Sequence, residues 1–449
     1  MKWVEGDLHT RGLSLLTFLY AALLQLESHG SLAVAVVLLL YALSQVGHWR
    51  WSAVDPFGRT FIYLLLLQFV AAVPIFLHSG LQLRLLEGGG RYLVLAAVVV
   101  VLASRLRRQL YSPLLGGVVV TAFVGGGIAL YQYYLLGYER ALLYQGAIFA
   151  SLIAVVTLLT LGVALPLLQQ LQRWRRVVSL LWIAALMFAL FTLFATGTKS
   201  AIVTLLVVSW LMVFLLLPRL GHRWRLLLLL VALLPPLLAY KSMPIVEQRI
   251  DNAWYALAQI VSGEESEHTQ RYLDYSTVTR YEQMKFGFLV LRERPWSGMT
   301  DGERVEFYQQ LVTAGEVIKY RHLPERGWGA AEVWADWQQD PEKPDWGHAH
   351  NEWLEMGASK GILGVVALLL LYLLPFRYFF SKREDPSLWV RVMARNGVVL
   401  VLAYFVFGWT EIPLQVKTTA VLYTLFITLL WASIRVVERG QVGSQSDIR

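Results

Sequence analysis

The sequence predicts an all-α integral membrane protein with about twelve transmembrane helices and one large helical loop on the outer face. Apolar runs of about 17 to 25 residues recur along its 449 residues, and each is long enough to cross the roughly 30 Å of bilayer hydrocarbon. Only 16% of the residues are charged, whereas soluble proteins carry roughly a quarter. Because backbone polar groups in lipid must be paired within each segment, helices are favoured over a barrel, whose strands would show short alternating patterns.

The expected spans fall into two groups separated by a long polar segment. Nine come first, at about 12–28, 31–47, 60–78, 91–104, 113–136, 141–166, 177–196, 200–217 and 225–240. Three follow, at about 361–380, 394–411 and 418–435. Pro235 and Pro236 should bend or break the ninth span.

These spans divide the chain into four regions. They are transmembrane helices at 1–240, a periplasmic loop subdomain at 241–360, transmembrane helices at 361–436 and a cytoplasmic tail at 437–449. The first apolar run lacks a small-residue cleavage site and is therefore interpreted as a retained span. The last ten residues, "GQVGSQSDIR", have the composition of a disordered segment.

Arginine distribution predicts the orientation. Alternate short loops are rich in arginine: Arg50 and Arg59; Arg105, Arg107 and Arg108; Arg173, Arg175 and Arg176; Arg219, Arg223 and Arg225; and the stretch Arg377–Arg395. By the positive-inside rule these loops and both termini are cytoplasmic. The net charge of +8 is concentrated in these clusters, so it does not indicate nucleic-acid binding. The absence of cysteine from the sequence excludes disulfides, zinc–thiolate sites and cysteine nucleophiles.

The loop at 241–360 is long enough for a functional subdomain rather than a turn. It mixes charged and aromatic residues in "DNAWYALAQI", "RYEQMKFGFLVLRERPW" and "AAEVWADWQQD". This pattern favours amphipathic helices that lie against the bundle.

The loop ends in "GHAHNEWLEMGASKGILG", which leads into an apolar run. Asn351 suits a helix N-cap, and Glu352 and Glu355 would occupy the first turn, where the helix dipole favours negative charge. His350 would then stand at a helix N-terminus, where the dipole opposes protonation and keeps the imidazole able to accept a proton, as a general base must. Asn351 and Glu355 are candidates for orienting it. The simpler alternative is a surface histidine at the membrane interface.

The pair His348 and His350 does not predict a metal site. Ligands two residues apart converge only on an extended strand, and no third ligand follows at a zinc-protease spacing. We therefore expect His348 to support the site and expect no metal and no cofactor.

Several outer-face cations are candidates for binding an anionic headgroup. Arg280 lies on an expected amphipathic helix that precedes a Pro-Trp-Ser-Gly turn, and Lys199 lies in a tight turn between two spans. Arginine matches phosphate oxygens with a planar fork, whereas lysine offers a point charge. Snorkelling of Lys199 and an exposed ion pair of Arg280 are the alternatives. Weaker candidates are Arg84, Arg91 and Arg304.

In combination, these elements resemble the O-antigen ligase and polymerase superfamily of bacterial inner-membrane glycosyltransferases. The matching features are the inter-span turn, the "R…PW.G" loop, "HAHNEWLE…GILG" before an apolar span, and "VFGWTE" in a later span, over roughly residues 176–414. The resemblance implies a GT-C-like fold without metal or cofactor. It also implies transfer of a glycan from undecaprenyl pyrophosphate to a sugar hydroxyl of lipid A–core at the periplasmic face.

The resemblance also implies roles for individual residues. His350 corresponds to the base, Arg280 to the arginine that binds the pyrophosphate, and Lys199 to a turn arginine, whose charge it keeps without the fork. A single displacement would invert the anomeric carbon.

Four alternative functions remain. An O-antigen polymerase would use a second lipid-linked glycan as acceptor, and a protein O-oligosaccharyltransferase would use a protein hydroxyl. A transporter would show ionisable residues deep within its spans and repeat symmetry, and the sequence shows neither. A lipid-binding scaffold would not need His350.

Overall fold

The computed structural model describes residues 8–26, 28–106, 108–144, 146–170, 175–216, 221–262, 275–317 and 348–446. Within these ranges the chain forms helices and turns and no β-strand, and ten helices are long and apolar enough to cross a membrane. The protein is therefore an all-α integral membrane protein, as the sequence predicts. The expected helix at "AAEVWADWQQD" lies outside the described residues.

Ten helices precede the outer loop. They are α1 Leu8–Ala22, α2 Ser28–Ser44, α3 Pro56–Val70, α4 Val73–His78, α5 Glu87–Arg105, α6 Tyr111–Leu130, α7 Ala147–Ala164, α8 Arg175–Ala195, α9 Lys199–Leu216 and α10 His222–Ser242. The loop contributes α11 Pro244–Ser262, α12 Tyr275–Glu293 and α13 Asp301–Thr313, and the chain ends with α15 Glu352–Ser381, α16 Leu388–Phe407 and α17 Lys417–Ser446. Single turns of 3₁₀ or π-helix connect some of these elements: η1 Val46–His48, η2 Trp51–Ala53, η3 Leu83–Leu86, η4 Tyr131–Leu135 and η5 Leu165–Gln170.

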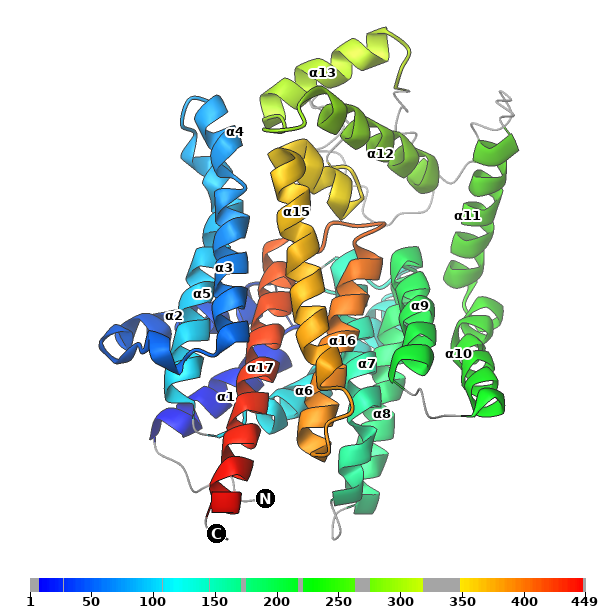
Figure 1. The fold of residues 1–449 in the computed structure, drawn as a ribbon. Coiled ribbons are helices and arrows are strands. Elements are labelled where there is room, and N and C mark those ends of the chain that lie inside the picture. Colours follow the sequence, from blue (N-terminus) through cyan, green and yellow to red (C-terminus); the bar gives the residue numbers. More distant parts are fainter. Residues whose placement is uncertain are drawn as a thin grey trace.

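All twelve expected spans are helices, but the first two are short. α1 has 15 residues and α2 has 17, and at about 1.5 Å per residue neither reaches the roughly 30 Å that a perpendicular crossing needs. In Figure 1 α2 lies nearly crosswise to the long helices such as α3 and α17. In the part of the chain that the structure describes, ten helices rather than the expected twelve or so are long and apolar enough to span a membrane.

Two local expectations need correction. The prolines were expected to bend or break the ninth span, and α10 is not broken there, because it continues through Pro235 and Pro236 to Ser242. α17 continues past Gly440 to Ser446, where the sequence predicts disorder. A helix already nucleated in a span gains one hydrogen bond for each residue added, which favours this extension.

The outer subdomain covers the end of the bundle that carries the start of α15. α12 and α13 lie over that end, and the start of α8 and the end of α17 lie at the other (Figure 1). The predicted Pro-Trp-Ser-Gly turn is present and joins the two parts. The N–H of Met299 donates to the carbonyl of Ala358 at 2.8 Å, and the N–H of Ile362 donates to the carbonyl of Pro295 at 2.7 Å.

This docking explains an interruption within α15. Gly361 has φ +65, which only glycine adopts readily, and a Cβ there would lie 2.6 Å from the carbonyl carbon of Trp296. Gly298 has φ +68, and a Cβ there would lie 2.6 Å from the carbonyl of Ala358. Both glycines thus allow two backbones to meet at the point where α15 enters the apolar part of the bundle.

Candidate active site

The N-terminus of α15 forms as the sequence predicts and also fixes a second loop. The Asn351 side chain caps the helix by accepting from the N–H of Leu354 at 3.1 Å, and its amide donates to the carbonyl of Trp409 at 3.0 Å. The N–H of Glu352 donates to the carbonyl of Gly408 at 2.8 Å. These bonds hold the loop between α16 and α17 directly beside His350.

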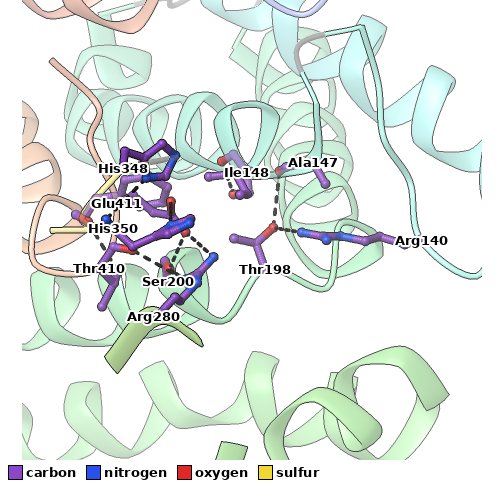
Figure 2. Close-up of polar contacts among 12 residues, drawn as sticks. Arg140, Ala147, Ile148, Thr198, Ser200, Arg280, His348, His350, Thr410 and Glu411 are labelled. Atoms are coloured by element: carbon purple, nitrogen blue, oxygen red, sulfur yellow. Dashed lines mark hydrogen bonds and ion pairs between the residues drawn. The ribbon is translucent and has the colours of Figure 1, made fainter. Parts of the chain in front are cut away.

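That loop brings Glu411 to the histidine. The Glu411 carboxylate lies 3.3 Å from Nδ1 of His350 through one oxygen, and 2.6 Å from Nη2 of Arg280 through the other. Glu411 is 1% exposed, whereas the side chains of His350 and Arg280 are 20% and 23% exposed. A buried carboxylate therefore bridges the two residues that sequence reasoning placed in the site (Figure 2), and both of those side chains remain partly exposed.

The charges around Glu411 determine its protonation and that of the ring. Burial alone would raise its pKa, but Arg280 and the hydrogen bond from His350 outweigh burial and lower the pKa of Glu411. An ionised carboxylate can only accept, so Nδ1 of His350 carries the proton and donates it. In the neutral imidazole Nε2 is then the acceptor nitrogen, which is the arrangement that a general base requires.

Sequence reasoning did not select Glu411 as a site residue. It appeared only as the last residue of "VFGWTE", and it is 61 residues from His350 in the sequence. The available signal was a single acid in the short connection between two apolar runs. A carboxylate there is costly to bury unless it is paired.

The turn between α8 and α9 also reaches the site. Oγ of Ser200 lies 3.4 Å from both Oε1 of Glu411 and Nη1 of Arg280, and Nη1 lies 3.4 Å from the carbonyl of Thr410. Lys199 is half-buried and is the first residue of α9, immediately before Ser200. The structure thus brings the predicted turn to the site, where Ser200 contacts Arg280 and Glu411.

His348 packs against the reactive ring. The two imidazole rings are 4.0 Å apart in an edge-on arrangement, and Nδ1 of His348 accepts the backbone N–H of His350 at 3.3 Å. Burial, followed by the proximity of His350, lowers the pKa of His348 to about 4. Its ring is therefore neutral near pH 7. Within the described ranges no group of three or more His, Cys, Asp or Glu side chains is placed to hold a metal ion.

The remaining predicted residues lie in contacts around the site. Arg304 forms a buried ion pair with Glu355 at 2.9 Å, and Glu355 accepts the N–H of Ala349 at 2.8 Å. Glu355 thus supports the backbone of the His350 segment, while Glu411 contacts the ring. Arg91 donates to the carbonyl of Gln415 at 2.9 Å, and the exposed Arg84 lies 3.6 Å from Asp301.

Comparison with known families gives one match. Residues 184–369 match the family model described as O-antigen ligase. This match supports membership of the O-antigen ligase superfamily. A search of curated proteins found no match. The matched region runs from α8 into α15, so it includes Ser200, Arg280 and His350, whereas Glu411 lies beyond it. Membership implies a glycosyltransferase-like activity of the ligase or polymerase type.

Proposed function

We propose that the protein is an O-antigen ligase of the bacterial inner membrane. It transfers a glycan from undecaprenyl pyrophosphate to a sugar hydroxyl of lipid A–core at the periplasmic face. The observation that carries this proposal is the Glu411 carboxylate bridging His350 and Arg280. One side of that bridge serves proton removal from an acceptor, and the other serves charge stabilisation on a leaving group.

The first half of the reaction is activation of the acceptor. Nε2 of His350 takes the proton of the sugar hydroxyl while its oxygen forms a bond to the anomeric carbon. Glu411 stabilises the imidazolium that results and holds the ring in the required tautomer, as the acid does in a hydrolase triad. General-base assistance of this kind contributes about 10²- to 10⁴-fold to the rate. Attack opposite the leaving group inverts the configuration at that carbon.

The second half is departure of the lipid diphosphate as the anomeric carbon–oxygen bond breaks. Arg280 uses one nitrogen for Glu411, and its contacts to Ser200 and Thr410 are both long, at 3.4 Å, compared with about 2.9 Å for an ordinary hydrogen bond. These donors can turn to phosphate oxygens at little cost. Charge-assisted bonds from a guanidinium would then stabilise the negative charge where it develops. Lys199, beside Ser200, supplies a second positive charge.

The orientation is also part of the proposal. The arginine-rich segments Arg175–Arg176 and Arg377–Arg395 border the ends of helices remote from the site, and the start of α8 and the end of α17 mark that side in Figure 1. The positive-inside rule makes that side cytoplasmic, together with both termini. His350 and the subdomain at 241–360 then face the periplasm, where both lipid-linked substrates are accessible.

Reconstitution tests the function and separates its alternatives. Proteoliposomes containing the full chain and undecaprenyl-pyrophosphate glycan are offered lipid A–core, a second donor molecule or a pilin-like protein as acceptor. We expect glycan transfer to lipid A–core. Transfer only to the second donor would make the protein a polymerase, and transfer only to the pilin-like protein would make it a protein ligase. Absence of transfer in every arm would contradict the proposal.

The His350→Ala variant tests the base in the same assay. We expect transfer to fall by about 10²- to 10⁴-fold, with normal membrane insertion. His78→Ala is the matched control. His78 is a half-exposed histidine at the end of α4, and it contacts Glu303 of α13 at 2.9 Å. It should retain activity. A His350→Ala enzyme that works at the wild-type rate would rule out the base assignment.

A further inference from the structure

The opening segment of α15 lies back against the longer part of the same helix. Glu352 and Tyr372 are 20 residues apart, and their side chains nonetheless meet, because the Tyr372 hydroxyl donates to Oε2 of Glu352 at 2.6 Å. In a straight helix 20 residues would rise about 30 Å, far beyond the combined reach of the two side chains. The reversal occurs at Gly361, where φ is +65 and ψ is −163, and Figure 1 shows the start of α15 at an angle to its longer part. The segment that follows His350 is therefore tied to a membrane-spanning helix through Glu352.

The other oxygen of the Glu352 carboxyl holds the loop between α16 and α17. Oε1 accepts the backbone N–H of Leu414 at 2.5 Å, and the carbonyl of Leu414 accepts from the Tyr92 hydroxyl of α5 at 3.1 Å. At the other end of the loop, the N–H of Glu352 donates to the carbonyl of Gly408, and a Cβ on Gly408 would lie 3.0 Å from Oε2. Glu352 thus contacts the loop three residues before and three residues after Glu411.

The surroundings of Glu352 favour a role in positioning over a direct role in the chemistry. Its side chain is fully buried, and so are those of Tyr372 and Leu414. A buried carboxyl is costly unless its oxygens are hydrogen-bonded, and both oxygens of Glu352 are. Hydrogen bonds of this kind keep a catalytic group close to its productive position, and a misplacement of about 1 Å can lower a rate by about 100-fold.

We propose that Glu352 is a positioning residue that, anchored by Tyr372, holds the loop between α16 and α17 so that the Glu411 carboxylate stays against His350. Only one residue separates His350 from Glu352 in the sequence. The same short segment therefore carries the base and holds the loop that carries its carboxylate partner. This inference rests on the proposed function, because it concerns the pair that activates the acceptor hydroxyl.

Steady-state kinetics of the full chain in proteoliposomes tests the inference. Glu352→Ala removes both side-chain hydrogen bonds, so we expect kcat for glycan transfer to fall by about 10- to 100-fold per folded enzyme. The KM values for donor and acceptor should change little, because the buried side chain is exposed to neither.

Glu352→Gln is the conservative variant. Its amide oxygen can accept the N–H of Leu414, and its amide nitrogen can donate to the hydroxyl oxygen of Tyr372. The Tyr372 hydroxyl can then turn its proton to the carbonyl of Tyr404, which lies 3.5 Å away. Glu352→Gln should therefore retain most of the wild-type kcat. If it is as slow as Glu352→Ala, the charge or proton of the carboxyl is required rather than its hydrogen bonds, and the inference is overturned.

Two tyrosine variants supply a matched comparison. Tyr372→Phe removes the anchor of Glu352 and keeps the ring, so we expect a smaller fall in kcat than in Glu352→Ala. Tyr423→Phe removes the hydroxyl of another fully buried tyrosine, which donates to the carbonyl of Leu371 at 2.8 Å, and should leave kcat unchanged. If Glu352→Ala does not fold, this pair replaces it, and equal kcat values in the two tyrosine variants would overturn the inference.

A double variant tests whether Glu352 acts through Glu411. In the Glu411→Gln background the ionised partner of His350 is already lost, so adding Glu352→Ala should lower kcat much less than it does in wild type. Fully additive effects would make Glu352 a purely structural residue. So would a Glu352→Ala enzyme with a lower unfolding midpoint and the wild-type kcat.

Hydrogen exchange separates this inference from the proposed function, because it does not require transfer. Amide exchange in the segment 408–416 is followed by mass spectrometry in lipid nanodiscs. We expect exchange to be about fivefold faster in Glu352→Ala than in wild type, since one hydrogen bond is lost, and nearly unchanged in Glu352→Gln. That pattern without glycan transfer by any enzyme would retain the positioning of the loop and reject the function. Transfer by wild type, with exchange and kcat unchanged in Glu352→Ala, would retain the function and reject the positioning residue.

Discussion

Two arginine–glutamate pairs lie close to the N-terminus of α15, and only one of them has the features of a reaction centre. In the Arg304–Glu355 pair both side chains are nearly inaccessible, at 8% and 11% exposed. Arg304 also contacts Asp301 and the carbonyl of Met299, while Glu355 accepts a backbone N–H. In the Arg280–Glu411 pair the arginine is 23% exposed, and the acid's second partner is an imidazole.

The difference lies in what each carboxylate holds in place. Glu355 fixes backbone, and through Ala349 it sets the conformation of the segment that ends at His350. That residue has φ +45, which is uncommon outside glycine and costs of the order of 1 kcal/mol or more. Glu411 instead fixes a side chain that can exchange a proton. A buried ion pair is therefore weak grounds for a functional site unless one partner is both titratable and accessible.

The largest stability effect should come from Glu355. Glu355→Gln removes the carboxylate that neutralises the buried Arg304, so we expect the free energy of unfolding to fall by about 3 kcal/mol. The lower midpoint is measured by thermal unfolding in detergent, followed by tryptophan fluorescence. Glu306→Gln, at an exposed position of α13, should leave the midpoint unchanged. A Glu355→Gln midpoint equal to that of this control would mean that the two pairs do not differ in the proposed way.

The next effect is on activity and concerns the arginine of the other pair. Arg280→Lys keeps the positive charge but cannot contact Glu411 and a phosphate with one planar group, so glycan transfer should fall by about 10- to 100-fold. Lys199→Arg gains a fork at the neighbouring position and should retain or improve transfer. Both are measured as initial rates in proteoliposomes. Normal activity in Arg280→Lys, or its collapse in Lys199→Arg, would remove these cations from the site.

The smallest effect concerns pH and His348. Its pKa in the folded protein is about 4 and its ordinary value is about 6.5, so the unfolded chain binds more protons between these values. Its contribution to stability is then complete above about pH 6.5 and is lost as the pH falls towards 4. In His348→Asn the unfolding midpoint should fall less between pH 7 and pH 5 than in wild type, by of the order of 2 °C. Equal falls in both proteins would place His348 in a more solvated environment than the structure shows.

Much of the fold follows from local sequence patterns. Each of the twelve apolar runs coincides with a helix, because length and hydrophobicity determine where a chain can cross lipid. Asn351 predicts its own helix start correctly, since an N-cap acts on a backbone N–H only three residues away. The continuation through Pro235 and Pro236 and the interruption at Gly361 were not predicted. In the latter case the cause is a turn about 65 residues earlier in the chain.

The residues of the candidate site are harder to predict from the sequence, because many of them meet only through the packing of distant helices. The structure brings together His350, Arg280 and the turn at Lys199, and the sequence could point to each because it is a polar element near the outer end of an apolar run. Glu411 and Ser200 were missed because their proximity arises from how α9, α12, α15 and α16 pack. The spacing of residue types along the sequence does not predict such tertiary contacts. Arg304 was one of the weaker candidates for contacting phosphate, and its burial against Glu355 likewise depends on packing.

One measurement tests the contrast between the two pairs most directly. Glu411→Gln and Glu355→Gln make the same chemical change in each pair, and glycan transfer to lipid A–core is compared at matched amounts of folded enzyme. Glu411→Gln should lower the rate of glycan transfer by about 10²- to 10⁴-fold, and Glu355→Gln should remain the more active variant. The unfolding midpoint of Glu411→Gln should nevertheless lie closer to that of wild type than the midpoint of Glu355→Gln does. A Glu411→Gln enzyme that transfers glycan as fast as wild type would contradict the account.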